Sequence, residues 1–142
     1  MRTVRQLLAD KPAEVFAVAP GAPVLEAVRL MAQKSVGAVL VLRGEELAGI
    51  LSERDYARKV VLQGRSSADT PASAIMTAQV VTVEPDTSVP VCMQLMTERR
   101  IRHLPVLEQG RVVGVISIGD LVKAVIADQQ LELEQLQRYI AG

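Results

Sequence analysis

The chain has 142 residues and a mass of 15.3 kDa, and a chain of this size buries roughly 70% of its unfolded surface without disulfide or metal staples. Its 16 Lys and Arg residues balance 16 Asp and Glu residues, and aromatic residues make up only 2%, which argues against nucleic-acid binding through bulk charge or base stacking. The hydrophobic content of 49% and the charged content of 23% are those of a globular protein and exclude a disordered segment.

The scarcity of certain residue types and motifs limits the compartment, the kind of metal site and the class of enzyme that the sequence allows. The first residues carry too many charges for a secretory signal, and no apolar run approaches the ~20 residues that cross a bilayer, so no membrane association is expected. The single cysteine, Cys92, favours a cytoplasmic location. With the single histidine, His103, it leaves too few soft ligands for a structural zinc site. No nucleophile elbow, Walker loop or His-Glu-x-x-His sequence is present, so we expect no enzymatic activity.

The chain contains an internal duplication. Residues 15–55 align without a gap on residues 80–120, at a constant offset of 65. Eleven pairs are identical, whereas average residue usage gives about two or three by chance. A period this long predicts that each copy is a unit of several helices and strands. The identical pairs are Val15/Val80, Val18/Val83, Pro20/Pro85, Val24/Val89, Leu30/Leu95, Met31/Met96, Val41/Val106, Leu42/Leu107, Gly49/Gly114, Ser52/Ser117 and Asp55/Asp120.

In chain order, residues 3–10 are predicted to form a small amphipathic lead-in helix. The first copy then reads as strand, helix, strand, strand and helix, with a turn at 43–46 and a closing helix over 53–62. A polar linker follows at 63–71.

The second copy has the same order of elements. Residues 80–83 predict a short strand, and Thr87 or Ser88 caps the next helix. Residues 103–107 and 112–117 predict a hairpin, and a helix runs from about Ile118 to Tyr139. The end of this helix carries an apolar stripe with a period near 3.5, which indicates helix-on-helix packing, either on the lead-in helix or, as we favour, on another protein chain. The stripe comprises Val122, Val125 or Ile126, Gln129, Leu133, Leu136 and Ile140.

These elements predict an α/β (α+β) fold of two β-α-β-β-α repeats packed about a pseudo-twofold axis. Face-to-face packing of the repeats would create two related clefts. We expect four segments: the lead-in helix with the first repeat at 1–64, a linker with a short connecting helix at 65–78, the second repeat at 79–127, and a C-terminal helical extension at 128–142.

The segments Gly49–Asp55 and Gly114–Asp120 share the pattern Gly, two apolar residues, Ser, two residues, Asp, and Ile101–Val106 precedes the second of them. With the duplication, this pattern resembles a stand-alone pair of cystathionine β-synthase (CBS) domains, or Bateman module, over about residues 3–127. The resemblance implies a non-catalytic sensor that binds an adenine nucleotide between the repeats. AMP is favoured, with ATP, ADP and NAD(H) as alternatives. It further implies a homodimer that regulates a partner in trans.

The resemblance also implies roles for individual residues. Ser117 with Asp120, and Ser52 with Asp55, would contact the phosphate or ribose, while Arg102 and His103 would contact a phosphate. The strand entries Thr82–Val83 and Ala17–Val18 would line the adenosine pocket. The complete set of candidate nucleotide-binding residues is Ser117, Asp120, Thr82, Val83, Arg100, Arg102, His103, Leu104, Pro105, Gly119, Ser52, Arg54, Asp55, Lys34, Val36 and Ala38.

Each of these assignments has a plainer alternative. Ser-x-x-Asp before a helix is also an N-cap followed by a favourable acid, and both roles can operate together. The first copy has Val36–Val39 where the second has the basic pair, so unequal use of the two clefts is expected. Arg54 is a cation at a helix N-terminus and a candidate phosphate ligand, whereas Arg99 suits a solvated helix end. For the whole protein, the alternative function is a ligand-independent oligomerisation or adaptor module.

Overall fold

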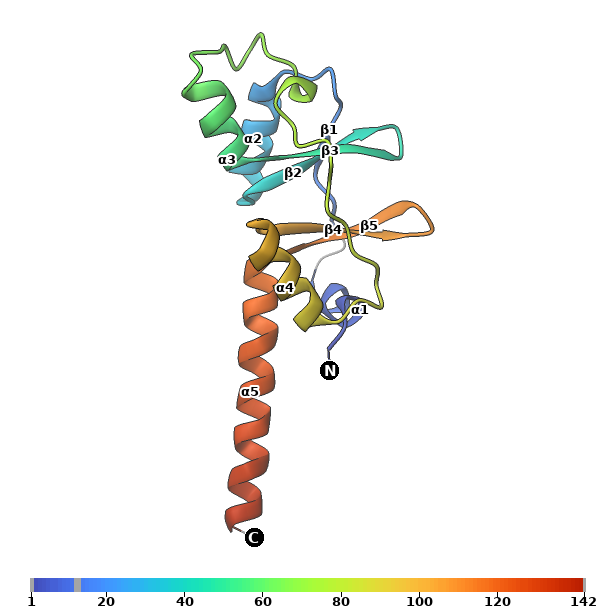
Figure 1. Cartoon of the computed structure of the whole chain (residues 1–142), viewed down its shortest axis with the longest axis vertical. Coiled ribbons are helices and arrows are strands. Elements are labelled where there is room, and N and C mark those ends of the chain that lie inside the picture. Colours follow the sequence, from blue (N-terminus) through green and yellow to red (C-terminus); the bar gives the residue numbers. More distant parts are fainter. Residues whose placement is uncertain (1, 12–13, 142) are drawn as a thin grey trace.

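The computed structural model describes residues 2–11 and 14–141, and its two halves follow the duplication. In each half a β-hairpin carries helices on one face, and the two hairpins lie side by side with their helices directed away from each other (Figure 1). Each half has its own cluster of buried apolar side chains. The predicted fold of two α/β repeats is therefore confirmed.

The first half contains β1 (Ala17–Val18), α2 (Val24–Lys34), β2 (Ala38–Arg43) and β3 (Glu46–Ser52). Its sheet has the order β1-β2-β3, with β1 parallel and β3 antiparallel to β2. Helix α2 buries Val24, Ala27 and Met31 because positions three and four residues apart share a helical face. The predicted closing helix begins as α3 (Glu53–Tyr56) and continues as a π-helical segment, Ala57–Val61.

The second half contains α4 (Val89–Arg99), β4 (His103–Glu108), β5 (Arg111–Ser117) and α5 (Ile118–Ala141). Ser88 caps α4 by accepting a hydrogen bond from the Val91 N–H. The predicted strand at 80–83 is wrong in extent, because only Val83 bridges to β4. In the first half the Leu40 N–H donates to the Phe16 carbonyl, but the matching residue of β4 is Pro105, which has no N–H to donate. The parallel ladder therefore shortens to one bridge.

The lead-in helix α1 (Val4–Ala9) precedes the first repeat in sequence but packs on the second. Val4 and Leu7 are buried in the second half's apolar cluster. The Val4 N–H donates to the Thr87 carbonyl at 2.9 Å, and the Val89 N–H donates to the Arg2 carbonyl at 2.9 Å. The N-terminus thus crosses from the second repeat to reach β1 of the first.

The polar linker is docked on the first repeat. The Leu25 N–H donates to the Ser67 carbonyl at 3.0 Å, and Thr70 is buried. The expected connecting helix is a single 3₁₀ turn, Ala72–Ala74. Beyond it, Thr77 and Ile50 exchange two backbone hydrogen bonds as an antiparallel bridge, which places the connecting segment beside the edge strand β3.

Helix α5 extends well beyond the body of the protein (Figure 1). Its first turns bury Leu121 and Ala124, whereas residues 129–141 are all exposed. Two ion pairs join α5 to the residues flanking α1 within the described part of the chain, Arg2 to Asp128 and Lys11 to Asp120, both at 2.8 Å, and neither involves residues beyond Asp128. The stripe therefore does not pack on the lead-in helix, and Ile126, Leu133, Leu136 and Ile140 remain open to solvent.

Candidate functional site

Both Ser-x-x-Asp motifs form helix caps, as their spacing predicts. In the first copy the Asp55 N–H donates to Ser52 Oγ at 3.1 Å, and the Ser52 N–H donates to Asp55 Oδ2 at 3.0 Å. In the second copy the equivalent distances between Ser117 and Asp120 are 3.2 and 2.9 Å. Each serine and aspartate therefore fixes the N-terminal turn of a helix where a strand ends.

A cavity of about 290 Å³, the first cleft, lies beside Ser52 and Asp55. Its other walls come from the connecting segment 79–81 and from residues 100–103 at the start of β4. Arg54 and Glu53 also line it. The first cleft therefore combines a helix N-terminus with basic side chains of the opposite repeat, a combination suited to an anionic ligand.

A second cleft, of about 510 Å³, is lined by Ser117 and by residues at matching positions of the duplication. Glu14 and Phe16 stand where the first cleft has Gln79 and Val81, and residues 35–38 stand where it has 100–103. Lys34, Val36 and Ala38 line this cleft as well. The two clefts are thus related by the same pseudo-twofold arrangement as the repeats.

The structure groups the basic residues of the second repeat with the Ser-x-x-Asp motif of the first. Arg100 and Arg102 line the first cleft with Ser52 and Asp55, and neither lines the second cleft with Ser117. The reason is geometric, since each repeat's motif faces the strand entry of the other repeat. The matching positions of the second cleft hold Ser35 and Gly37. The two clefts therefore differ in the kind of cation that lines them, with Arg54, Arg100 and Arg102 in the first and Lys11 and Lys34 in the second.

Several candidates lie outside the clefts. Val83, Leu104 and Pro105 are buried in the second half, and Thr82, Gly119 and Asp120 line none of the cavities described here. Asp120 lies behind Ser117, which does line the second cleft. Ala17 and Val18 likewise line no cavity, and the residues that do so lie one or more positions upstream. Sequence reasoning missed Arg58, Lys11 and the wall residues 79–81 and 14–16, although the offset of 65 pairs those two walls.

The two aspartates differ in free acceptor capacity. Asp55 Oδ1 lies 3.1 Å from Lys59 Nζ and accepts from Thr77 Oγ1 at 3.4 Å, while its Oδ2 accepts from Ser52. These contacts fill about four lone-pair sites of the carboxylate. Asp120 Oδ2 accepts from Lys11 Nζ at 2.8 Å, but no donor reaches its Oδ1 from the part of the chain that the structure describes. Asp120 can therefore accept a ligand hydroxyl without losing a present contact.

Lys11 also favours the ionised form of Asp120. Burial alone would raise the pKa of this carboxyl, but the hydrogen bonds from Lys11 and Ser117, with the Lys11 charge, bring it below its ordinary value. Lys11 Nζ donates in addition to the Val115 carbonyl at 2.8 Å. The carboxylate therefore stays ionised as a hydroxyl acceptor.

His103 lies between the clefts and lines both. A Cβ placed on Gly37 would lie 3.4 Å from the imidazole, so glycine gives the ring room at this point. Burial lowers the pKa of His103, with Glu53 and Asp120 raising it and Lys11 and Arg102 lowering it. The ring is therefore neutral near pH 7.

The lowered pKa of His103 predicts a pH dependence of stability. The unfolded chain binds more protons than the folded chain near pH 6.5, the ordinary value, so unfolding free energy should fall as pH drops below it. The Asp120 contribution is retained until pH falls below the ordinary 3.8. Urea unfolding between pH 7.5 and 4.5 should show the upper decline, and His103→Gln should remove it. Equal declines in both proteins would contradict this assignment.

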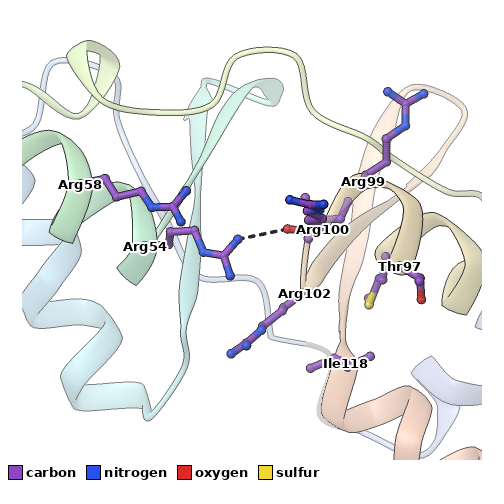
Figure 2. Close-up of a pocket in the computed structure, with 9 residues that line it drawn as sticks. Arg54, Arg58, Thr97, Arg99, Arg100, Arg102 and Ile118 are labelled. Atoms are coloured by element: carbon purple, nitrogen blue, oxygen red, sulfur yellow. Dashed lines mark hydrogen bonds between the residues drawn. The ribbon is translucent and has the colours of Figure 1, made fainter.

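A third cavity, of about 720 Å³, adjoins the first cleft and is called here the arginine cavity. Figure 2 shows Arg54 and Arg58 extending from the first repeat toward the second, Arg102 entering the space between them, and Arg99 pointing away. Arg54 Nη1 donates to the Arg100 carbonyl at 3.3 Å across the two repeats. The remaining wall is formed by Met96, Thr97, Ile101 and Ile118.

Among residues 2–11 and 14–141, no helix is long and apolar enough to cross a membrane. The same residues contain no group of three or more His, Cys, Asp or Glu side chains placed to hold a metal ion.

Comparison with known proteins finds one family and close relatives. The CBS domain family matches residues 4–62 and 72–127. The mitochondrial protein CBSX3 of Arabidopsis thaliana is 48% identical over 124 residues, which is 84% of this chain and 60% of that protein, so the chain spans less than two thirds of this relative. Because this relative is named as mitochondrial, the cytoplasmic location expected for this chain stays a prediction.

Solved structures agree in fold. A CBS-domain protein from Burkholderia ambifaria is 56% identical with a TM-score of 0.87, covering 90% of this chain and 96% of that one. The CBS domain protein PAE2072 from Pyrobaculum aerophilum, determined as a complex with AMP, is 28% identical with a TM-score of 0.75, covering 84% of this chain and 89% of that one. The fold of this chain thus recurs in these CBS-domain proteins.

Proposed function

Because this chain belongs to the CBS-domain family, as a tandem pair, we propose that it is a non-catalytic sensor of adenine nucleotides. The nucleotide binds in the clefts between the repeats and alters how the protein engages a partner in trans. The carrying observation is the pair of symmetry-related clefts, each lined by the serine of a Ser-x-x-Asp helix cap, with Asp55 lining the first cleft and Asp120 behind Ser117 in the second. The AMP complex of PAE2072 supports AMP as the first ligand to test.

The chemistry of the clefts fits a nucleoside monophosphate. An ionised carboxylate accepts hydrogen bonds from a vicinal diol, and helix N–H groups with nearby cations bind phosphate. In the second cleft these groups are Asp120, behind Ser117, with Lys34 and His103 on the wall. In the first cleft they are Asp55, Arg100 and Arg102. The first cleft is lined by arginines, and the second is larger and retains an open acceptor.

The proposed assembly is a homodimer formed through α5. Five of its exposed apolar residues, Val122, Ile126, Leu133, Leu136 and Ile140, together with Gln129, follow alternating steps of four and three, which is the spacing of a two-helix seam. The alternative function, an adaptor that needs no ligand, is favoured by the capping contacts alone, because both Ser–Asp pairs already have a structural role. Nucleotide binding decides between the two functions.

We expect AMP to raise the melting temperature in a panel that includes ADP, ATP, NAD, NADH and S-adenosylmethionine. A ligand at one hundred times its dissociation constant adds about 2.7 kcal/mol of stability, which corresponds to a shift on the order of 5–10 degrees for this size. Asp120→Ala should remove the shift due to the second cleft, and Asp55→Ala the shift due to the first. Each variant is compared with its own ligand-free melting temperature, because loss of a cap lowers stability by itself.

Asp69→Ala is the matched control, since Asp69 is an exposed linker aspartate outside both clefts. It should keep the full nucleotide shift. A panel without any shift in the unaltered protein would reject the sensor and leave the adaptor function. Release of phosphate from ATP at enzymatic rates would reject the non-catalytic assignment.

A further inference from the structure

The projecting part of α5 carries an apolar seam that the rest of the chain does not cover. Residues 129–141 extend beyond the body of the protein and are all exposed (Figure 1). An unpacked helix of fewer than about 15 residues is only marginally stable in water, and packing of its apolar face is what normally holds it. The stripe assigns a heptad repeat to this helix. Its a positions are Ile126, Leu133 and Ile140, and its d positions are Val122, Gln129 and Leu136.

Gln129 is the polar member of this stripe. A side-chain amide carries donors and an acceptor, so two copies of Gln129 that face each other can satisfy one another inside an apolar seam. An amide that faces leucine in the same seam loses its partner and costs stability. In a parallel, in-register pair of helices d faces d, whereas in an antiparallel pair d faces a. Gln129 therefore favours a second copy of this chain, aligned parallel and in register.

The positions that flank the seam distinguish the two directions by charge. In a parallel pair each g residue faces the e residue five positions further along the other helix. Glu132 then faces Gln137 of the second copy, whose amide can donate to the carboxylate. In the antiparallel register that uses the whole stripe, Ile140 lies opposite Val122 and the two copies of Glu132 lie side by side. Like charges placed together oppose that pairing.

We propose that α5 forms a parallel, in-register, two-stranded coiled coil with α5 of a second copy, and that Gln129 sets the register. This arrangement rests on the α5 homodimer of the proposed function and adds the direction of the two helices. Because α5 begins directly after Ser117, which lines the second cleft, parallel helices place the second clefts of both copies at the same end of the coiled coil. Antiparallel helices would place them at opposite ends, roughly 27 Å apart along the helix axis.

Disulfide cross-linking tests the direction of the helices. Ile140→Cys should give at least tenfold more covalent dimer in a glutathione redox buffer than Gln135→Cys, a matched control on the side of the helix opposite the stripe. Antiparallel helices would separate the two residues at position 140 by roughly 27 Å in the full register, and by roughly 16 Å in the register shifted by one heptad. The native Cys92 does not compete, because it is buried and burial raises the pKa of its thiol.

Charge at position 137 tests the register independently. In the parallel pair Gln137→Lys faces Glu132 of the second copy, so its dimer should be about tenfold tighter than that of Gln137→Glu in sedimentation equilibrium. In the full antiparallel register position 137 faces Lys123, and the order of the two variants reverses. In a Glu132→Gln background the difference should shrink at least threefold. This control separates the contact between copies from the effect of Glu134 within the same helix.

The outcomes separate this proposal from the proposed function. Equal cross-linking at positions 140 and 135, or a tighter dimer with Gln137→Glu than with Gln137→Lys, overturns the parallel pair without affecting the nucleotide sensor. A monomeric unaltered chain overturns the parallel pair together with the α5 homodimer. Cross-linking at position 140 in a protein whose melting temperature no nucleotide raises supports the parallel pair and rejects the sensor alone.

Discussion

We expect Gly49→Ala to lower the free energy of unfolding by about 3 kcal/mol, the largest effect among alanine substitutions of the glycines that the structure describes. A Cβ at Gly49 would lie 2.6 Å from Met76 Sδ and 2.9 Å from the Thr77 carbonyl oxygen. The side chain of Met76 can move, but the Thr77 backbone cannot do so freely, because Thr77 and Ile50 exchange hydrogen bonds of 2.8 and 3.0 Å. Overpacking and the loss of these bonds together give the expected magnitude.

Two further glycines provide the scale for this measurement. A Cβ at Gly114 would lie 2.6 Å from Leu8 Cδ2, the far end of a flexible side chain, so Gly114→Ala should cost less, about 1–2 kcal/mol. A Cβ at Gly21 would meet nothing within 4 Å, so Gly21→Ala should change stability by less than about 0.5 kcal/mol. Urea unfolding of the three variants should give the order Gly49, Gly114, Gly21. An effect at Gly49 no larger than that at Gly21 would contradict the close approach seen in the structure.

This ordering explains why the shared sequence pattern begins with glycine. Gly49 and Gly114 occupy matching positions, yet different segments cross them: the connecting segment at Met76–Thr77 in one repeat, and α1 through Leu8 in the other. Each crossing segment precedes a strand entry that forms a cleft wall. The glycine therefore acts through packing, by letting a cleft wall approach the sheet.

Much of the fold was predictable because the two copies of the duplication indicate the same order of helices and strands independently. The offset of 65 relates the hairpins, the β-bulges at Val41/Leu42 and Val106/Leu107, and the left-handed helix ends at Ser35 and Arg100. The strand at 80–83 was overestimated since β-branched residues signal a strand without revealing that Pro105 removes a donor from its partner. Local patterns thus identify elements, and pairing depends on the opposite strand.

The clefts were less predictable than the fold because they form between repeats. Ser52 and Asp55 are recognisable in sequence, but their basic neighbours come from 100–103, and no local spacing relates these segments. Arg58 was missed since it lies in a π-helical segment after α3, outside any motif. The Lys11 contact with Asp120 was equally hidden, since the two residues are distant in sequence. Contacts between charged residues that are distant in sequence become evident only in the folded structure, where the two repeats lie against each other.

The second large effect concerns assembly through α5. We expect deletion of residues 130–142 to convert a homodimer into a monomer while preserving the fold, since residues 129–141 are exposed and Asp128 keeps its ion pair with Arg2. Burying a leucine or isoleucine side chain contributes roughly 1.5–3 kcal/mol, so removal of Leu133, Leu136 and Ile140 from both helices should weaken the dimer by several orders of magnitude. Sedimentation equilibrium at micromolar concentration measures the change.

A substitution tests the stripe itself, because a deletion also shortens the helix. Leu133→Lys/Leu136→Lys places charge on the seam and should give a monomer with an unchanged melting temperature of the body. Leu131→Lys/Gln135→Lys adds the same charge on the side of the helix opposite the stripe and should remain dimeric. If both pairs stay dimeric, the subunits associate through another surface, and if the unaltered chain is a monomer, the exposed stripe belongs to a different protein partner. In either case α5 would not be the surface through which two copies of this chain form a dimer.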